Sequence, residues 1–220
     1  GSEMCIRDSF KSLENNNYLI KEIKIKAAFV KCSAEFTCPE IVRGNIVHFV
    51  SRKAFDIEGL GQEIINTFNK KGYLNDVADI YNLKAHKNDL MDMDGFGEKS
   101  ISNLLNSIEK SRRIDLHRLI YSLGISEVGE ATSRNLAQEY KNIDSFLEAD
   151  FDQLLEIDDI GPKVASNIVN YIKTDFAQSL LPRIIKELDV IEVDEVNLAD
   201  LPLNGVQVVL TGKLNNFSRD

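Results

Sequence analysis

The chain has 220 residues but no tryptophan, only four prolines and only three cysteines. No apolar run approaches the roughly 20 residues that a membrane-spanning helix needs, so no membrane partner is expected. Three cysteines are too few for the disulfide framework of a small secreted domain. With 43% hydrophobic and 28% charged residues, the composition is that of an ordinary globular protein.

An excess of positive charge is also missing. The chain carries 26 Lys and Arg against 35 Asp and Glu, for a net charge of −9. Residues 55–175 alone hold 13 basic and 22 acidic side chains. A partner held by a broad basic surface is therefore disfavoured. If this region binds phosphate groups, main-chain amides and a few placed cations must do so.

A short pattern occurs four times: an apolar residue, two variable residues, a second apolar residue and a glycine. The copies span residues 57–61, 93–97, 125–129 and 157–161, and their final glycines lie 36, 32 and 32 residues apart. Seven residues after each final glycine stands another apolar residue: Phe68, Leu104, Leu136 and Ile168. A tight apolar turn followed by a helix with one buried face is typical of a helix-hairpin-helix unit. We therefore predict a mainly α fold with a tandem helix-hairpin-helix domain.

These turns can present main-chain amides to a ligand. Glycine can adopt positive φ and has no Cβ to block an approaching group. The amides after it belong to the open, positive end of the next helix, where a nucleic-acid phosphate fits without regard to base sequence. Lysines follow two of the turns. The candidate DNA-binding residues are Gly59, Gly61, Gly95, Gly97, Lys99, Gly129, Gly161 and Lys163.

The four copies are not identical, and a different reading stays open. Glu127 and Asp159 replace the first glycine in copies three and four, and an acidic side chain there could repel phosphate. On this chemistry copies one and two are the stronger candidates. The alternative is that the glycines are packing corners of a helical protein-interaction domain, although four evenly spaced copies disfavour it.

Cys32 and Cys38 are the candidate metal ligands, since Cys5 lies far from them. Two thiols cannot complete a four-ligand zinc site. From spacing alone, two ordinary thiols or half of a zinc module both remain open. His48 lies ten residues after Cys38 within an apolar helical stretch, which favours a packed histidine.

Several of these segments together resemble bacterial NAD-dependent DNA ligases. Residues 31–39 and 48–61 resemble the junction between the zinc finger and the first hairpin of that family. Residues 95–105 and 123–132 are similar to its second and third hairpins, and 208–214 to the first strand of its BRCT domain. The resemblance covers residues 30–220, with the motifs in the same order.

The resemblance implies a domain organisation. Residues 1–9 fit none of the later patterns and are expected to be an extraneous leader. By the resemblance, 10–54 would be part of a zinc finger with a connecting helix, and 55–187 the four-repeat domain. An acidic linker at 188–204 and a truncated BRCT start at 205–220 would follow. Cys32 and Cys38 would be the second pair of a four-cysteine zinc site.

The resemblance also implies a function. The parent enzyme would seal single-strand nicks in duplex DNA during replication and repair, using NAD and magnesium bound by domains outside this chain. This portion would bind nicked double-stranded DNA as a monomer in the bacterial cytoplasm, near the nucleoid, and would not seal nicks unaided. A free-standing helix-hairpin-helix module that binds DNA structures is the main alternative.

Overall fold

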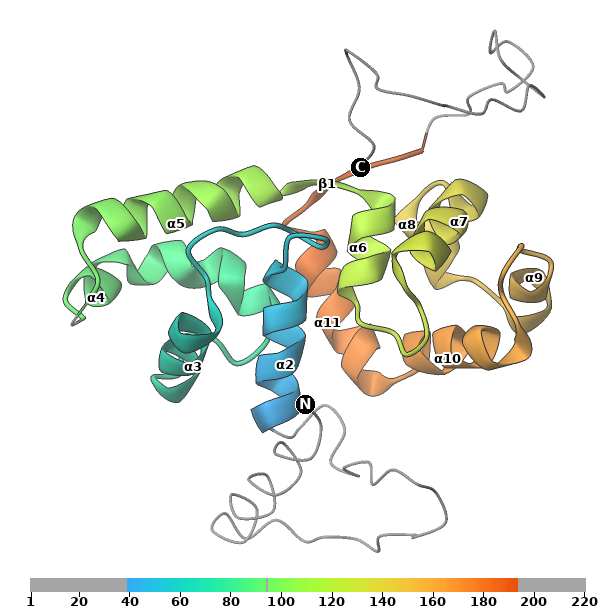
Figure 1. The fold of residues 1–220 in the computed structure, drawn as a ribbon, viewed down its shortest axis with the longest axis horizontal. Coiled ribbons are helices and arrows are strands. Elements are labelled where there is room, and N and C mark those ends of the chain that lie inside the picture. The colour runs from blue at the N-terminus through green and yellow to red at the C-terminus, as the bar shows by residue number, and fades with distance from the viewer. Residues whose placement is uncertain (1–38, 94, 194–220) are drawn as a thin grey trace, which may run out of the picture.

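The computed structural model describes residues 39–93 and 95–193. The fold is mainly helical, as the sequence predicts, and Figure 1 shows the arrangement of its elements. In chain order the elements are α2 (Pro39–Val50), α3 (Gln62–Lys70), the 3₁₀-helix η2 (Ala78–His86), α4 (Lys87–Met91), α5 (Glu98–Ser111), β1 (Arg113–Asp115), α6 (Leu116–Ser122), α7 (Glu130–Tyr140), α8 (Ile143–Leu147), α9 (Phe151–Leu155), α10 (Pro162–Ile172), α11 (Asp175–Ile185) and β2 (Asp189–Ile191).

The helices form two groups on either side of three central helices. Helices α3 to α5 lie at one end of the molecule and α7 to α10 at the other, with α2, α6 and α11 between them (Figure 1). Arg183 of α11 links the central helices to the start of η2, because its guanidinium contacts Asp76 at 2.6 Å and Asp79 at 3.3 Å. The first and second repeats precede α3 and α5, and the third and fourth precede α7 and α10. We call the two ends of the molecule that contain these helices its two halves (Figure 1).

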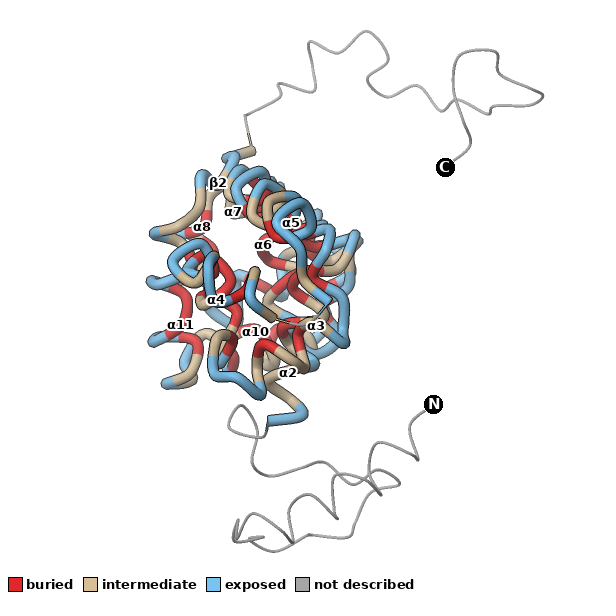
Figure 2. Tube along the Cα trace, turned by 90° about the vertical axis from the view of Figure 1, so that its left-hand side faces the viewer, coloured by how far each residue is buried: buried red, intermediate tan, exposed pale blue. Residues whose placement is uncertain are grey.

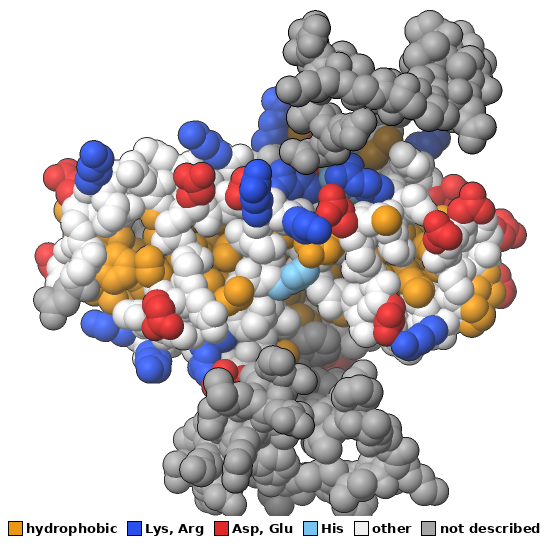
Figure 3. All heavy atoms as spheres, in the orientation of Figure 1, with side chains coloured by type: hydrophobic (Ala, Val, Ile, Leu, Met, Phe, Trp, Pro, Cys, Tyr) orange, Lys and Arg blue, Asp and Glu red, His pale blue; other side chains and the backbone are white. Residues whose placement is uncertain are grey.

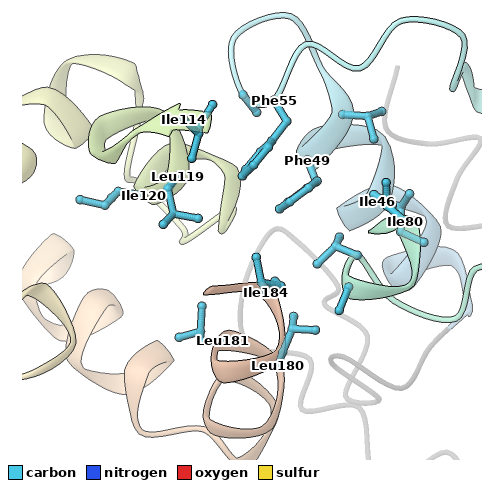
Figure 4. Close-up of a cluster of buried hydrophobic side chains, with 14 of the residues drawn as sticks. Ile46, Phe49, Phe55, Ile80, Ile114, Leu119, Ile120, Leu180, Leu181 and Ile184 are labelled. Atoms are coloured by element: carbon cyan, nitrogen blue, oxygen red, sulfur yellow. The ribbon is translucent and has the colours of Figure 1, made fainter. Parts of the chain in front are cut away.

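Buried residues of both halves form one hydrophobic core. Figure 2 shows these buried residues in red on the inner sides of the helices. At its centre the rings of Phe49 and Phe55 stack with their centroids 4.0 Å apart. Side chains of α6 and α11, among them Leu119 and Ile184, converge on the same cluster (Figure 4). Helix α2, which precedes the first repeat, packs against both α3 and α6.

The helix bounds follow the sequence pattern closely. The pattern predicts helices at 98–112 and 162–173, and the structure has α5 and α10 within one residue of these ranges. Pro162 occupies the first turn of α10, where its missing N–H costs nothing. None of the helices in the described ranges is long and apolar enough to cross a bilayer.

The two short strands pair in parallel, with Ile114 of β1 beside Val190 of β2. Strand β2 lies within residues 188–204, for which the sequence predicts an acidic linker, so the start of that segment is ordered against β1. The pairing could not be read from the sequence because three residues are too few to show a strand period. The predicted leader, both candidate zinc cysteines and the predicted BRCT start lie outside the described residues.

Candidate nucleic-acid interface

The first glycine position of each repeat has a left-handed backbone. Gly59 and Gly95 both have φ of 86°, and Glu127 and Asp159 have φ of 68° and 64°. The four turns, which we number hairpins 1 to 4, therefore share one backbone conformation although two of them lack the glycine. Residues other than glycine adopt this backbone conformation at a cost of about 1–2 kcal/mol.

The turn itself is closed by a main-chain hydrogen bond. In hairpins 2 to 4 the N–H of the second apolar residue donates to the carbonyl oxygen of the first at 3.0–3.1 Å, as Phe96 to Met93, Val128 to Ile125 and Ile160 to Ile157. Positive φ at the third residue of such a turn is the requirement of a type II turn. The apolar pattern thus anchors each hairpin in the core while its glycine end faces solvent.

The final glycine of each repeat has a different role. Gly61, Gly97, Gly129 and Gly161 are the N-caps of α3, α5, α7 and α10, with extended backbones whose φ lies between −107° and −72°. The carbonyl oxygen of each accepts the first hydrogen bond of its helix, at 2.9–3.1 Å. The freedom to adopt positive φ, expected from the sequence for a hairpin glycine, is used at the first position and not here.

The final glycines also stand in open space. All four are exposed, and no described atom lies within 4 Å of a Cβ built on any of them. Neither backbone conformation nor packing therefore requires glycine at these positions. The absence of a side chain at each of these glycines leaves the first amides of the following helix accessible to a ligand.

Those helix starts lack side-chain caps at the N-cap residue, unlike α8, α9 and α11. In the described ranges, no side chain of the N-cap residue caps α3, α5, α7 or α10. By contrast, Asn142, Asp150 and Thr174 each accept a backbone N–H at the starts of α8, α9 and α11. The first amides of a helix have no partner within the helix, so the hairpins present donors at the positive end of the helix dipole. Hairpin 4 offers one donor fewer, because Pro162 has no N–H.

Hairpins 3 and 4 are joined by a reciprocal pair of amide side chains. Asn167 of α10 donates to the carbonyl oxygen of Ser126 in hairpin 3 at 2.9 Å. Asn135 of α7 donates to that of Asp158 in hairpin 4 at 3.3 Å. Each helix thus supports the hairpin that precedes the other helix. The two turns are held as one unit.

Hairpin 1 is supported by α5 in a related way. The backbone N–H of Glu58 donates to Oγ of Ser107 at 2.8 Å. A Cβ on Gly59 would lie 3.5 Å from Cβ of Leu104, which is ordinary contact. At hairpin 2 the hydroxyl of Ser100 accepts the N–H of Gly97 at 3.1 Å, so that amide is already occupied.

The two predicted lysines have different surroundings. Lys99 is exposed in the first turn of α5. Lys163 forms an ion pair with Glu127, at 2.7 Å between Nζ and Oε1. The acidic residue expected to repel phosphate at hairpin 3 is therefore paired with the cation expected to attract it at hairpin 4. Their roles in DNA binding stay predictions.

A cluster of cations that the sequence analysis missed lies between the two halves. We call it the central basic patch and define it as Arg52, Lys53, Lys110, Arg113, Arg118 and Arg134. Lys and Arg side chains gather at the middle of the face shown in Figure 3. The residues of the patch come from four separate segments of an acidic chain. A count of charges along the sequence therefore does not reveal the patch.

Comparison with known proteins agrees with this geometry. A family described as a helix-hairpin-helix motif matches residues 118–181, which contain hairpins 3 and 4. A DNA ligase of Brevibacillus brevis is 38% identical over 185 residues, covering 83% of this chain and 28% of that protein.

Two further relatives show the same relation. DNA ligases of Natranaerobius thermophilus and Finegoldia magna are 39% and 36% identical, over 83% and 92% of this chain. The chain spans only 28% and 30% of those two proteins. It is therefore homologous to a segment of the bacterial DNA ligases, one that carries a helix-hairpin-helix motif.

Proposed function

We propose that this chain is the DNA-binding portion of an NAD-dependent DNA ligase. In this proposal the four hairpins hold the backbone of nicked duplex DNA through main-chain amides. The homology to DNA ligases supports the parent reaction, and the hairpin geometry supports a DNA-binding role for this segment.

One observation carries the proposal: each of four exposed N-caps is a glycine that the fold itself does not require. Serine, aspartate or asparagine would cap these helices at least as well, and space for them exists. A bound phosphate explains the choice, since it needs the amides uncapped and the approach unobstructed. Contacts of this kind position a duplex without reading its sequence.

The chemistry of the parent enzyme is part of the proposal. Nick sealing would use NAD and magnesium held by domains outside this chain, so the chain would bind nicks without sealing them. Zinc would be held through Cys32, Cys38 and a further pair of cysteines, at a site outside the described residues.

Serine in place of the hairpin glycines tests the proposal. In the full chain, Gly61, Gly97, Gly129 and Gly161 are changed together to Ser. The new Cβ narrows the approach and the new hydroxyl can cap an amide, while the helix start is preserved or improved. Binding to a labelled nicked duplex is measured by fluorescence anisotropy, and we expect the affinity to fall at least about tenfold, equivalent to about 1.4 kcal/mol.

Gly44→Ser is the control, because Gly44 is exposed in α2, away from the hairpins, with no described atom within 4 Å of an added Cβ. It should leave the affinity unchanged. Circular dichroism would show that both variants are folded. Equal affinities for the fourfold variant and the control would contradict the proposal and favour a helical interaction domain.

A further inference from the structure

We infer that the central basic patch is a second phosphate-binding surface, which receives the duplex backbone between hairpins 1 and 3. The inference rests on the proposed function and adds a group of side-chain cations to a mode of binding that otherwise relies mainly on main-chain amides.

The patch is a connected surface. Lys53 and Arg134 both contact the carboxylate of Glu130, at 3.2 and 3.0 Å. Arg118 donates to the carbonyl oxygen of Arg52 at 2.8 Å, so α6 is tied to the loop that follows α2. The cations from distant segments are thus held next to one another by contacts within the protein.

A surface hollow of about 500 Å³ forms the other part of the patch. Lys110, Arg113 and Arg118 line it, with Asp56 and Glu58 as the acidic groups. Four neutral polar residues complete its polar lining: Asn103, Asn106, Ser107 and Ser111. A wide, polar and net positive hollow suits a hydrated phosphodiester group better than an apolar ligand.

The position of the patch links it to the hairpins. Glu58, on the wall of the hollow, belongs to hairpin 1. Glu130, which joins Lys53 to Arg134, directly follows Gly129, the N-cap glycine of hairpin 3. A nucleic-acid strand held by both hairpins would therefore cross the patch.

The charge balance of the patch supports an anionic occupant. His117 of α6 has its pKa lowered, first by burial and then by the guanidinium of Arg134, with Arg118 acting in the same direction against Asp115 and Glu130. In a chain of net charge −9, this concentration of cations at one place is complementary to phosphate. The acidic groups named at this place are four, Asp56, Glu58, Asp115 and Glu130, against the six cations of the patch.

The test removes three exposed charges of the patch from the full chain with the substitutions Lys53→Gln, Lys110→Gln and Arg113→Gln. Each phosphate contact contributes about 0.9 to the slope of log affinity against log salt concentration. We expect the slope to shrink by about 2 to 3 and the affinity for nicked duplex at about 0.1 M salt to fall at least tenfold. The control carries Lys70→Gln, Lys71→Gln and Lys186→Gln, which change the net charge equally at exposed sites outside the patch.

If the two triple variants give equal slopes, the inference about the patch is wrong. The proposed function would still stand if the fourfold serine variant has lost affinity for the nicked duplex. Failure of the unaltered chain to bind any duplex would overturn the proposed function itself. A single Arg113→Lys variant keeps the charge and should keep the slope, whereas Arg113→Gln should lose about 0.9. Comparing these two variants separates the effect of the charge at position 113 from the effect of replacing the arginine side chain.

Discussion

The ammonium group of Lys163 lies 2.7 Å from a carboxylate oxygen of Glu127, which ties the first turn of α10 to hairpin 3. Both side chains are well exposed, at 77% and 49%. An ion pair so open to water contributes only about 0–1 kcal/mol to stability. Its main effect is therefore on the charge that the two hairpins present to a phosphate.

Removing the Glu127 carboxylate should strengthen DNA binding. In Glu127→Gln, Lys163 loses its acidic partner and hairpin 3 loses one negative charge. We expect the affinity for nicked duplex to rise severalfold at low salt, with the free energy of unfolding changed by less than about 1 kcal/mol. Anisotropy titrations and urea unfolding measure the two quantities.

Glu148→Gln is the control, since it removes the same charge at an exposed position after α8. The gain from Glu127→Gln should exceed that from the control and should shrink when Lys163 is already Ala. If the two glutamine variants bind alike, the ion pair has no particular role in DNA binding.

The left-handed backbone conformation of Asp159 should lower the free energy of unfolding relative to a chain with glycine at this position. Asp159 has φ of 64°, a conformation that glycine adopts without steric cost. We expect Asp159→Gly to raise the free energy of unfolding by about 0.5–1 kcal/mol, after allowance for the greater flexibility of glycine in the unfolded chain. Urea denaturation measures this.

The neighbouring Asp158→Gly provides the comparison, because Asp158 does not have positive φ. There the added flexibility of the unfolded chain should lower stability instead. Equal effects of the two substitutions would show that backbone strain at hairpin 4 is negligible.

Local periodicity was enough to predict the hairpins. The apolar residues seven positions after the final glycines, Phe68, Leu104, Leu136 and Ile168, are all buried, at 2% exposure or less. Helix starts were predictable because an apolar turn followed by glycine and a polar first turn is a local signal.

What the sequence could not show depends on contacts between distant segments. The pairing of Glu127 with Lys163 joins residues 36 positions apart. The central basic patch joins Lys53 to Arg134 through Glu130, so it exists only once the two halves have packed. The left-handed backbone at Glu127 and Asp159 was also hidden, because the turn and its buried apolar neighbours impose a conformation that these residues alone do not favour.

Alkaline pH should destabilise the fold through Tyr171. Burial raises the pKa of Tyr171 to about 12, above the value near 10 of an exposed phenol. The folded state therefore favours the neutral phenol over the phenolate. The resulting contribution to the free energy of unfolding is full below about pH 10 and is lost as pH rises towards 12. Stability should fall over that range by up to about 1.4 kcal/mol per pH unit for this group.

The variant Tyr171→Phe keeps the ring and should show a shallower decline between about pH 10 and 11.5 in urea unfolding. Tyr73→Phe, which alters a phenol only partly buried, is the control and should follow the unaltered chain. Parallel declines for Tyr171→Phe and the unaltered chain would assign the alkaline instability to other groups, Tyr81 first among them, since burial raises the pKa of Tyr81 as well.

Arg112 should stabilise the fold through contacts that a lysine in its place could not make. It lies between α5 and β1, and its guanidinium donates to the main-chain oxygen and the carboxylate of Glu187 at 3.0 and 2.7 Å and to Glu109 at 3.1 Å. It also lies 5.0 Å from the centre of the Tyr81 ring.

The same contacts fix the strand pair, since the N–H of Asp189 donates to the carbonyl oxygen of Arg112 at 2.7 Å. A lysine cannot bond two carboxylates and a carbonyl through a planar fork, so Arg112→Lys should lower the free energy of unfolding by about 1–2 kcal/mol. Arg113→Lys, at the exposed next position, should change it by less than about 0.5 kcal/mol. If urea denaturation finds the two lysine variants equally stable, the planar fork of Arg112 is not what holds β2 against β1.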